Sequence, residues 1–398
     1  MIPEFRQTYN AAFTPQRFQE LIDSVDEELP GQLDFRVAET PIFVPAVLRD
    51  KLLQAGEDII DALVAPDFKE RTEAAVPPAQ RVPHEDAHTQ FLAIDFAVCR
   101  DAQGELEPQL IELQGFPSLY VFQDYLAHTF RKFLPIPDSV THLFGGLSSA
   151  DYLAKLRELL VGNENPENVV LLELFPDKQK TRIDFALTKR ELGVEAVCIT
   201  DVRKDGRQLY YEKDGCRIDI KRIYNRLIFD ELLRYPDLKL DFRLTDEDVD
   251  VTWVGHPNWF FRISKYTLPL LHSPFVPPSH YLHELSAYPA DLDNYVLKPL
   301  FSFAGAGVKL NVTPTELDAI EDKHNYLLQR KVAYEPVVLA ADGELVKCEI
   351  RLLYIWPENA PRPVLLTNLA RLSRGAMIGV DFNKNKDWVG GTVGLFAQ

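Results

Sequence analysis

The chain has 398 residues, 46% of them hydrophobic, so it can bury a large core and is expected to form two or three domains. Its net charge of −17, with scattered Lys and Arg, argues against nucleic acid and membrane surfaces as partners, because such a surface repels phosphodiester backbones and anionic lipid headgroups. The cysteines form no C-x-x-C pair, which argues against zinc and against a disulfide framework and suggests a reducing compartment; they are Cys99, Cys198, Cys216 and Cys348. The sequence shows neither a signal-peptide pattern nor an apolar run long enough to cross a bilayer, so we expect a cytoplasmic protein.

Helical periodicity dominates the first 80 residues. Apolar residues recur at i, i+3, i+4 and i+7 from Phe18 to Val25, and a second set runs from Leu48 to Leu63. The proline-rich stretch 76–83 then ends the helical pattern.

Two strands follow, Gln90 to Cys99 and Pro108 to Leu113, and each carries a carboxylate between apolar neighbours. The loop that joins them suits a hairpin. Side chains alternate between the faces of a strand, so a hairpin can place Asp95 beside Glu112 and Gln114 on one face. Two adjacent carboxylates with further oxygen ligands suit Mg²⁺. The alternative is an ordinary hairpin with a solvated polar face.

Helices are expected at 117–133 and 150–161, and the pattern from about 165 predicts a small α/β unit with some parallel strands. Its expected strands are 168–172 and 196–199, separated by a helix from Thr181 to Leu192. A hairpin follows with Asp-Gly turns at 205–206 and 214–215, and we expect residues 221–235 to return to helix.

The last region carries candidates for binding phosphates. Lys298 lies mid-strand, and the loop after it contains Ser302, Gly305 and Gly307, where glycine lets backbone N–H groups approach a phosphate. Lys265 is a second candidate. The alternatives are a flexible hairpin tip and an exposed lysine.

Further strands could complete a nucleotide cleft. The strand from Tyr326 to Val332, which includes Gln329 and Lys331, could offer backbone groups to adenine, and Glu335 could take the ribose hydroxyls. Arg351 and Arg371 lie on later strands, where guanidinium groups could stabilise a transferring phosphoryl group. Salt bridges within the sheet are the alternative for both arginines.

The segment His84-Glu85-Asp86-Ala87-His88 matches H-E-x-x-H, which places two zinc ligands on one face of a helix. Here it follows Pro83 and runs directly into a strand, so no long helix carries it. We therefore expect these histidines to be polar loop residues, with a zinc hydrolase as the alternative.

Taken in order, these segments resemble the circularly permuted ATP-grasp enzymes, of which the synthetase domain of glutathionylspermidine synthase is the best-known type. The resemblance covers roughly residues 85 to 398 and rests on Asp95, Glu112-Leu113-Gln114, Ser264-Lys265, Val296-Leu297-Lys298-Pro299 and Leu328-Gln329, with Asp219 to Arg226 resembling the family's middle domain. It implies an α/β (α+β) ATP-grasp fold of permuted order with these parts: a helical region 1–80, the metal-binding strands 81–160, a pre-ATP-grasp-like α/β domain 161–255 and the nucleotide-binding lobes 256–398.

The resemblance also implies site roles. Asp95, Glu112 and Gln114 would hold Mg²⁺, Lys265 and Lys298 would bind ATP phosphates, and residues 329–332 would line the adenine pocket. Two departures stand out: Gln114 replaces the usual Asn, and Ala93 replaces a family arginine, so that Arg351 or Arg371 would have to stabilise the acyl phosphate.

The sequence thus predicts an ATP- and Mg²⁺-dependent ligase that joins a small-molecule acid to an amine through an acyl phosphate. The alternative is a small-molecule kinase or a catalytically inactive nucleotide-binding partner protein on the same scaffold.

Overall fold

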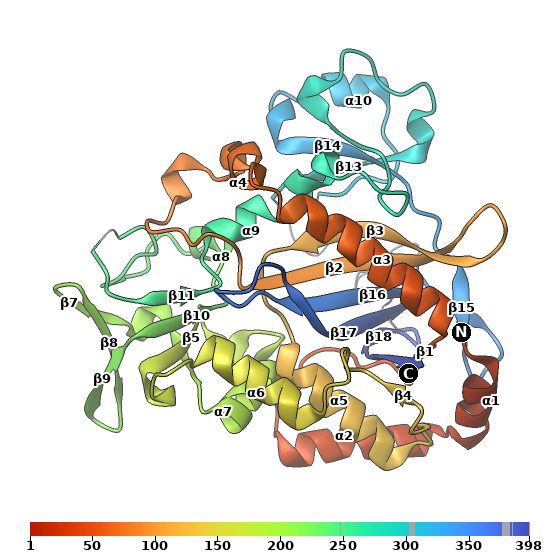
Figure 1. The fold of residues 1–398 in the computed structure, drawn as a ribbon, viewed down its shortest axis with the longest axis horizontal. Helices are drawn as coiled ribbons and strands as arrows, with labels where there is room; N and C mark the ends of the chain where they lie inside the picture. Colours follow the sequence, from red (N-terminus) through yellow and green to blue (C-terminus); the bar gives the residue numbers. More distant parts are fainter. Residues whose placement is uncertain (247, 302–306, 376–382, 384, 398) are drawn as a thin grey trace.

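The computed structural model describes residues 1–246, 248–301, 307–375, 383 and 385–397. Its centre is an antiparallel sheet in the order β18-β17-β16-β2-β3, with β15 also paired to β16 (Figure 1). These strands are β2 (Phe91–Arg100), β3 (Leu106–Gln114), β15 (Pro336–Leu339), β16 (Leu345–Ile355), β17 (Val364–Ser373) and β18 (Gly390–Thr392). Strands from the first third of the chain therefore pair directly with strands near its end.

The amino-terminal helices share a hydrophobic core with this sheet. They are α1 (Pro3–Ala12), α2 (Pro15–Glu28), α3 (Ala46–Leu63) and the single turn α4 (Phe68–Arg71). Buried side chains of α2 and α3, such as Leu21 and Leu52, belong to the same hydrophobic cluster as Ile94 of β2 and Ile350 of β16. Helical periodicity thus predicts both α2 and α3; α3 packs against β3 of the sheet, whereas α2 packs against the helix α5 (Tyr120–Phe133) (Figure 1).

A second layer is the parallel sheet β11-β10-β5-β6, with its own hydrophobic cluster. It comprises β5 (Val169–Glu173), β6 (Glu195–Cys198), β10 (Arg222–Asn225) and β11 (Thr252–Val254), and beside it lie the hairpin strands β7 (Arg203–Asp205), β8 (Gln208–Lys213) and β9 (Cys216–Ile220). Its helices and their neighbours are α5 (Tyr120–Phe133), α6 (Ser149–Leu160), α7 (Arg182–Leu192) and α8 (Phe229–Leu233). Helix α7 ends at Gly193, whose φ of +77° is the left-handed conformation in which glycine commonly follows a helix.

One prediction in this region is wrong. Residues 222–225 are not helix but the strand β10, which lies between β11 and β5, and only Phe229–Leu233 is helical. Ile223 and Tyr224 are buried on a strand covered on both faces, and periodicity cannot distinguish such a short apolar run from a buried helical turn.

The remaining strands form two small sheets. The antiparallel sheet β12-β14-β13 (β12 Ser279–Tyr281, β13 Tyr295–Pro299, β14 Tyr326–Arg330) has its own hydrophobic cluster with α10 (Pro314–Asp318), and it is the upper lobe of Figure 1. The sheet β1-β19-β4 (β1 Ile42–Val44, β19 Gly394–Ala397, β4 Val140–Thr141) ties the two ends of the chain together, since β1 and β19 pair in parallel. Between the lobes lie α9 (Asn258–Arg262) and the 3₁₀ helix η6 (Lys265–Leu270).

Among the described residues, none of the helices combines the length and the apolar character that crossing a bilayer requires.

Candidate functional site

The hairpin β2–β3 places its two carboxylates side by side. Asp95 pairs directly with Glu112 across the hairpin, and Arg351 of β16 pairs with Asp95 on the other side. Residues directly opposite in antiparallel strands share a face, so these three side chains form one row across the central sheet. The prediction that Asp95 and Glu112 lie together on one face is confirmed.

Two arginines, Arg351 and Arg371, hydrogen-bond the carboxylate of Asp95. Its side chain is 1% exposed and accepts two hydrogen bonds from Arg351, one of them 2.6 Å from Nη2 to Oδ2, and a third of 2.7 Å from Arg371 Nη2. Arg371 also bonds Glu349, which accepts a 2.8 Å hydrogen bond from the hydroxyl of Tyr334. Both oxygens of Asp95 are therefore shared with guanidinium groups.

Glu112 instead faces a ring of positive charge. Its carboxylate lies 3.7 Å from Lys265 Nζ and 3.9 Å from Arg351 Nη2, and it accepts a 3.0 Å hydrogen bond from Gln114 Nε2. Burial alone would raise the pKa of Glu112, but Lys265 and Arg351, with help from Arg371 and Lys298, lower that pKa to about 2. Glu112 is a carboxylate at any physiological pH.

Lys298 brings the small upper sheet to the hairpin. It lies in β13, is 8% exposed, and its Nζ donates a 3.1 Å hydrogen bond to the backbone oxygen of Ile111 in β3. Burial lowers its pKa to about 8, with Lys265 adding to the shift against the opposing effect of Glu112. The predicted convergence of the early acidic hairpin with the late lysine-bearing strand is therefore seen directly.

A pocket opens beside these groups, about 340 Å³ with the solvent at its mouth included. Its polar wall is Glu112, Gln114, Ser264 and Lys265, and its apolar wall comprises Leu113, Phe260, Ile263, Leu300 and Phe301. The pocket thus lies where the hairpin, η6 and the end of β13 meet.

The residues predicted to bind the nucleotide differ in whether their side chains already have partners within the protein. Gln329 is buried in β14, and its Nε2 has no hydrogen-bond partner among the described residues. This side-chain amide could therefore donate a hydrogen bond to a ligand. Lys331, which precedes Val332 in the chain, instead donates from Nζ to Asp293 O and, at 3.1 Å, to Asn311 Oδ1. Glu335 forms an ion pair with Arg100 at 2.8 Å.

Gly307 is the part of the predicted glycine loop that the structure describes. Ser302 and Gly305 lie outside the described residues. Gly307 has a φ of +73°, and a Cβ there would lie 2.8 Å from Pro299 Cγ. The backbone itself therefore requires glycine at this position, whatever the loop binds.

The residues fit a magnesium nucleotide in part. Glu112 and Gln114 present oxygen ligands of the kind that Mg²⁺ takes, beside two lysines that suit phosphate. Asp95 does not present its oxygens in the same way, because the two arginines hold them.

Sequence reasoning missed several residues here. Glu349 lies two residues before Arg351 on one strand, so the alternation of faces could have found it. Burial with Arg371 opposing raises the pKa of Glu349. Tyr334 carried no such signal, since it precedes its strand.

Arg226, at the carboxyl end of β10, joins the parallel sheet to the hairpin. It donates to the backbone oxygen of Pro117, and its guanidinium lies 4.6 Å from the ring centroid of Phe116. Nearby, burial raises the pKa of Glu173 to about 8 despite the opposing charge of Arg226. Glu173 and Arg226 thus lie together at the carboxyl ends of the parallel strands β5 and β10.

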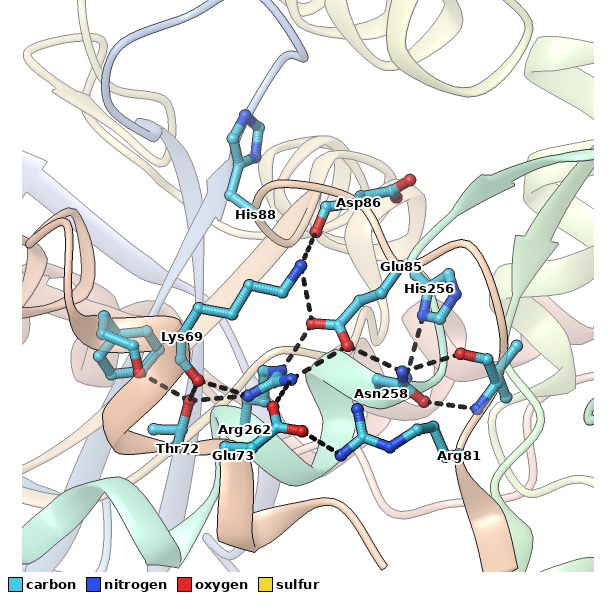
Figure 2. A network of polar contacts seen from close by, with 12 residues as sticks. Lys69, Thr72, Glu73, Arg81, Glu85, Asp86, His88, His256, Asn258 and Arg262 are labelled. Carbon is cyan, nitrogen blue, oxygen red and sulfur yellow. Dashed lines mark hydrogen bonds and ion pairs between the residues drawn. The ribbon is translucent and has the colours of Figure 1, made fainter. Parts of the chain in front are cut away.

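The H-E-x-x-H segment has another role. No helix carries it, and His84 has a φ of +59°, so its histidines do not share a helical face. Glu85 points instead toward Arg262 and Asn258, accepting hydrogen bonds of 2.6 Å and 2.8 Å (Figure 2). His88 stacks on Trp356 with 4.1 Å between ring centroids. The expectation of polar loop residues is confirmed.

The fold is similar to a solved structure of a glutathione synthetase-like effector, GSS30, from Globodera pallida in its apo form. The TM-score is 0.60 at 11% sequence identity, and the match covers 97% of this chain and 98% of that one. No model of a known family matches the sequence, and no curated protein does. The likeness shows the fold alone: a mixed α/β architecture with several sheets, of the glutathione synthetase-like kind.

Proposed function

We propose that this chain is an ATP- and Mg²⁺-dependent ligase that joins the carboxylate of a small molecule or peptide to an amine. The observation that carries the proposal is the place of Glu112, an ionised carboxylate between Lys265 and Arg351, on the strand whose backbone Lys298 contacts. Such a combination of carboxylate and clustered cations suits a metal-bound polyphosphate. The glutathione synthetase-like fold, which is related to ATP-grasp proteins, agrees with this chemistry.

The roles divide by charge. Glu112 and Gln114 would hold the Mg²⁺, which when bound neutralises phosphate charge. Lys265 and Lys298 would bind the phosphates, and Gln329 would donate to the base.

Asp95 is a positioning residue in this proposal, because it hydrogen-bonds Arg351 and Arg371, which would stabilise the reacting phosphoryl group. These arginines take the place of the cation that Ala93 does not supply, since Ala93 lies two residues before Asp95 on the same face of β2.

The reaction has two steps. A substrate carboxylate oxygen attacks the γ-phosphorus of ATP, and ADP leaves with the electrons of the broken P–O bond. An amine then attacks the acyl carbon, the C–O bond to phosphate breaks, and the amine proton is released. Positioning and electrostatic stabilisation would provide most of the acceleration.

Calorimetry with MgATP tests the nucleotide site. Replacing Lys298 by Ala removes a buried cation, so we expect ATP affinity to fall about tenfold or more, as for lost hydrogen bonds to charged groups. Lys189→Ala is the control, since Lys189 is an exposed residue paired with Glu195 on the parallel sheet. Unchanged ATP binding by Lys298→Ala would remove the phosphate role.

A kinase, or an inactive nucleotide-binding partner protein, is the second candidate. The arginines that hold Asp95 favour the inactive partner protein, because they leave fewer oxygens for the Mg²⁺ that both a ligase and a kinase need. Measuring ADP release with candidate acids, with and without amines, separates the three: a ligase needs both substrates, a kinase needs one, and a binding protein releases none.

A further inference from the structure

A cluster of metal-binding side chains lies outside the nucleotide site, where α5 packs beside the segment after β4. Asp124 and His128 lie one turn apart on α5, and His142 follows β4 directly. One potential ligand atom from each of the three lies within 4.8 Å of the others. Asp124 is 8% exposed and His142 is 4% exposed, whereas the side chain of His128 is 52% exposed. The cluster therefore has a buried base and an open mouth.

Asp124 Oδ1 is its centre. This oxygen accepts a 2.9 Å hydrogen bond from His142 Nε2 and a 2.6 Å hydrogen bond from Ser149 Oγ. Ligands bound tetrahedrally at about 2.0–2.1 Å lie roughly 3.3 Å apart. The His142 and Asp124 atoms would thus need to separate by only a few tenths of an ångström for a metal ion to replace the shared proton.

His128 is oriented as metal-binding histidines usually are. Its Nδ1 lies 2.8 Å from the backbone oxygen of Asp124, and since a carbonyl can only accept, Nδ1 carries the proton. Nε2 then keeps its lone pair, and it lies 3.4 Å from Ser149 Oγ, the hydroxyl that donates to Asp124 Oδ1. A second ring nitrogen bonded to a backbone carbonyl is the common outer-shell arrangement of zinc histidines.

We propose that Asp124, His128 and His142 bind one transition-metal ion, with zinc as the best-fitting ion. Two imidazoles and one carboxylate suit zinc and its neighbours in the periodic table, whereas Mg²⁺ and Ca²⁺ prefer oxygen alone. Three protein ligands leave a fourth position on the side of Ser149, open to water or to that hydroxyl. The sparse cysteines exclude only a cysteine zinc site, not this one.

The ion would join elements that are separate in sequence. Its ligands come from α5 and from the connection between β4 and α6. Ser149, beside the site, is the first residue of α6. Because an ion that binds only the folded chain stabilises it, zinc should raise the melting temperature. The site shares no residue with the proposed nucleotide site, so its failure would leave the ligase proposal intact.

Titration with ZnCl₂ tests the site on full-length protein without a polyhistidine tag. We expect about one zinc per chain by elemental analysis after dialysis, and Co²⁺ should give the visible bands of a four-coordinate ion. His128→Ala removes the half-exposed ligand, with little cost to folding. It should weaken zinc affinity about tenfold or more, since even outer-shell changes cost that much, and it should reduce the rise in melting temperature at the same zinc concentration.

The control is His283→Ala, because the ring of His283 lies only 4.0 Å from that of His324, another place where two histidines meet. It should bind zinc like the original chain. Asp124→Asn is a second loss variant of nearly the same shape, checked for folding by circular dichroism. Absent zinc binding, binding unchanged in His128→Ala and in Asp124→Asn, or loss in His283→Ala alone would each overturn the proposal.

Discussion

Lys298 is buried and Glu112 is half-buried, and the pKa values of the two respond oppositely to their surroundings. The cations around Glu112 outweigh its desolvation and hold its pKa near 2, whereas desolvation dominates at Lys298 and lowers its pKa to about 8. Lys298 is thus the member of the pair that titrates close to neutrality, and a phosphate ligand would favour its protonated form.

This difference predicts a pH dependence of ATP binding. Below pH 8 Lys298 is charged and binds without proton uptake; above pH 8 each binding event must also protonate it. ATP affinity should therefore fall by up to about tenfold per pH unit between pH 8 and 10. Calorimetry across pH 7 to 10 measures this fall.

Lys298→Arg and Lys298→Met are the paired variants. Arginine stays charged, so its ATP affinity should be flat over this range, and methionine should bind weakly and also without a slope. A flat profile in the original chain would contradict a phosphate contact by Lys298.

Single residues also show how far sequence reasoning reaches. The pairing of Asp95 with Glu112 followed from alternation and a hairpin turn, both of which are local. The sequence could not predict that two arginines form ion pairs with Asp95. These ion pairs depend on β16 and β17 pairing beside β2 at one particular register. Arg351 and Arg371 could be selected from the sequence, but their partner could not.

At the level of elements, periodic helices were predictable and short buried strands were not. α2 and α3 carry several turns of apolar periodicity, whereas β10 offers four residues whose pattern fits helix or strand equally. The segment 82–89 shows a third case, in which the H-E-x-x-H motif has a structural role rather than a metal-binding one. His256 and Asn258 hydrogen-bond the backbone oxygens of Pro83 and Val82, and Arg262 hydrogen-bonds the side chain of Glu85, so the chain is held in place just before β2 (Figure 2).

His256 predicts how this segment responds to acid. Burial lowers its pKa to about 4, and its Nε2 lies 2.9 Å from Pro83 O while its Nδ1 accepts from Asn258 N, so the folded chain holds it neutral. The unfolded chain binds a proton near pH 6.5, so the free energy of unfolding should fall as pH drops from 6.5 to 4. The loss attributable to His256 is roughly 3 kcal/mol at most.

Urea unfolding at several pH values measures this slope. His256→Gln keeps a donor for Pro83 but does not titrate, so its stability should change less between pH 6.5 and 4. His272→Gln, at an exposed position, should retain the original slope. Equal slopes in all three proteins would show that His256 does not control the acid response.

At the scale of the whole molecule, the candidate site exists because three distant segments meet. The hairpin, η6 and β13 contribute Glu112, Lys265 and Lys298, which are far apart in sequence. The order of the motifs along the chain led us to expect this meeting, but local patterns cannot specify how closely the segments approach. A single glycine sets that approach.

Gly115 follows directly after β3, and its N–H donates a 3.0 Å hydrogen bond to Ile263 O, two residues before Lys265. A Cβ at this position would lie 2.7 Å from the backbone oxygen of Trp259, a contact that backbone cannot relieve without moving. Gly115→Ala should therefore push α9 and η6 away from the hairpin. We expect a loss of about 1–3 kcal/mol in the free energy of unfolding, typical of overpacking, and roughly a tenfold or greater loss of ATP affinity as Lys265 moves from Glu112.

Gly391→Ala is the matched control, since a Cβ there would meet its nearest neighbour, Phe35, at an ordinary 3.5 Å. It should leave ATP affinity unchanged. Both variants are compared by urea unfolding and by calorimetry at a temperature where each is folded. If Gly115→Ala were destabilised yet bound ATP like the original chain, the contact would only support the fold. A joint loss of stability and affinity would instead show that the spacing between hairpin and η6 holds the phosphate lysine in place, because both measurements would then report one displacement.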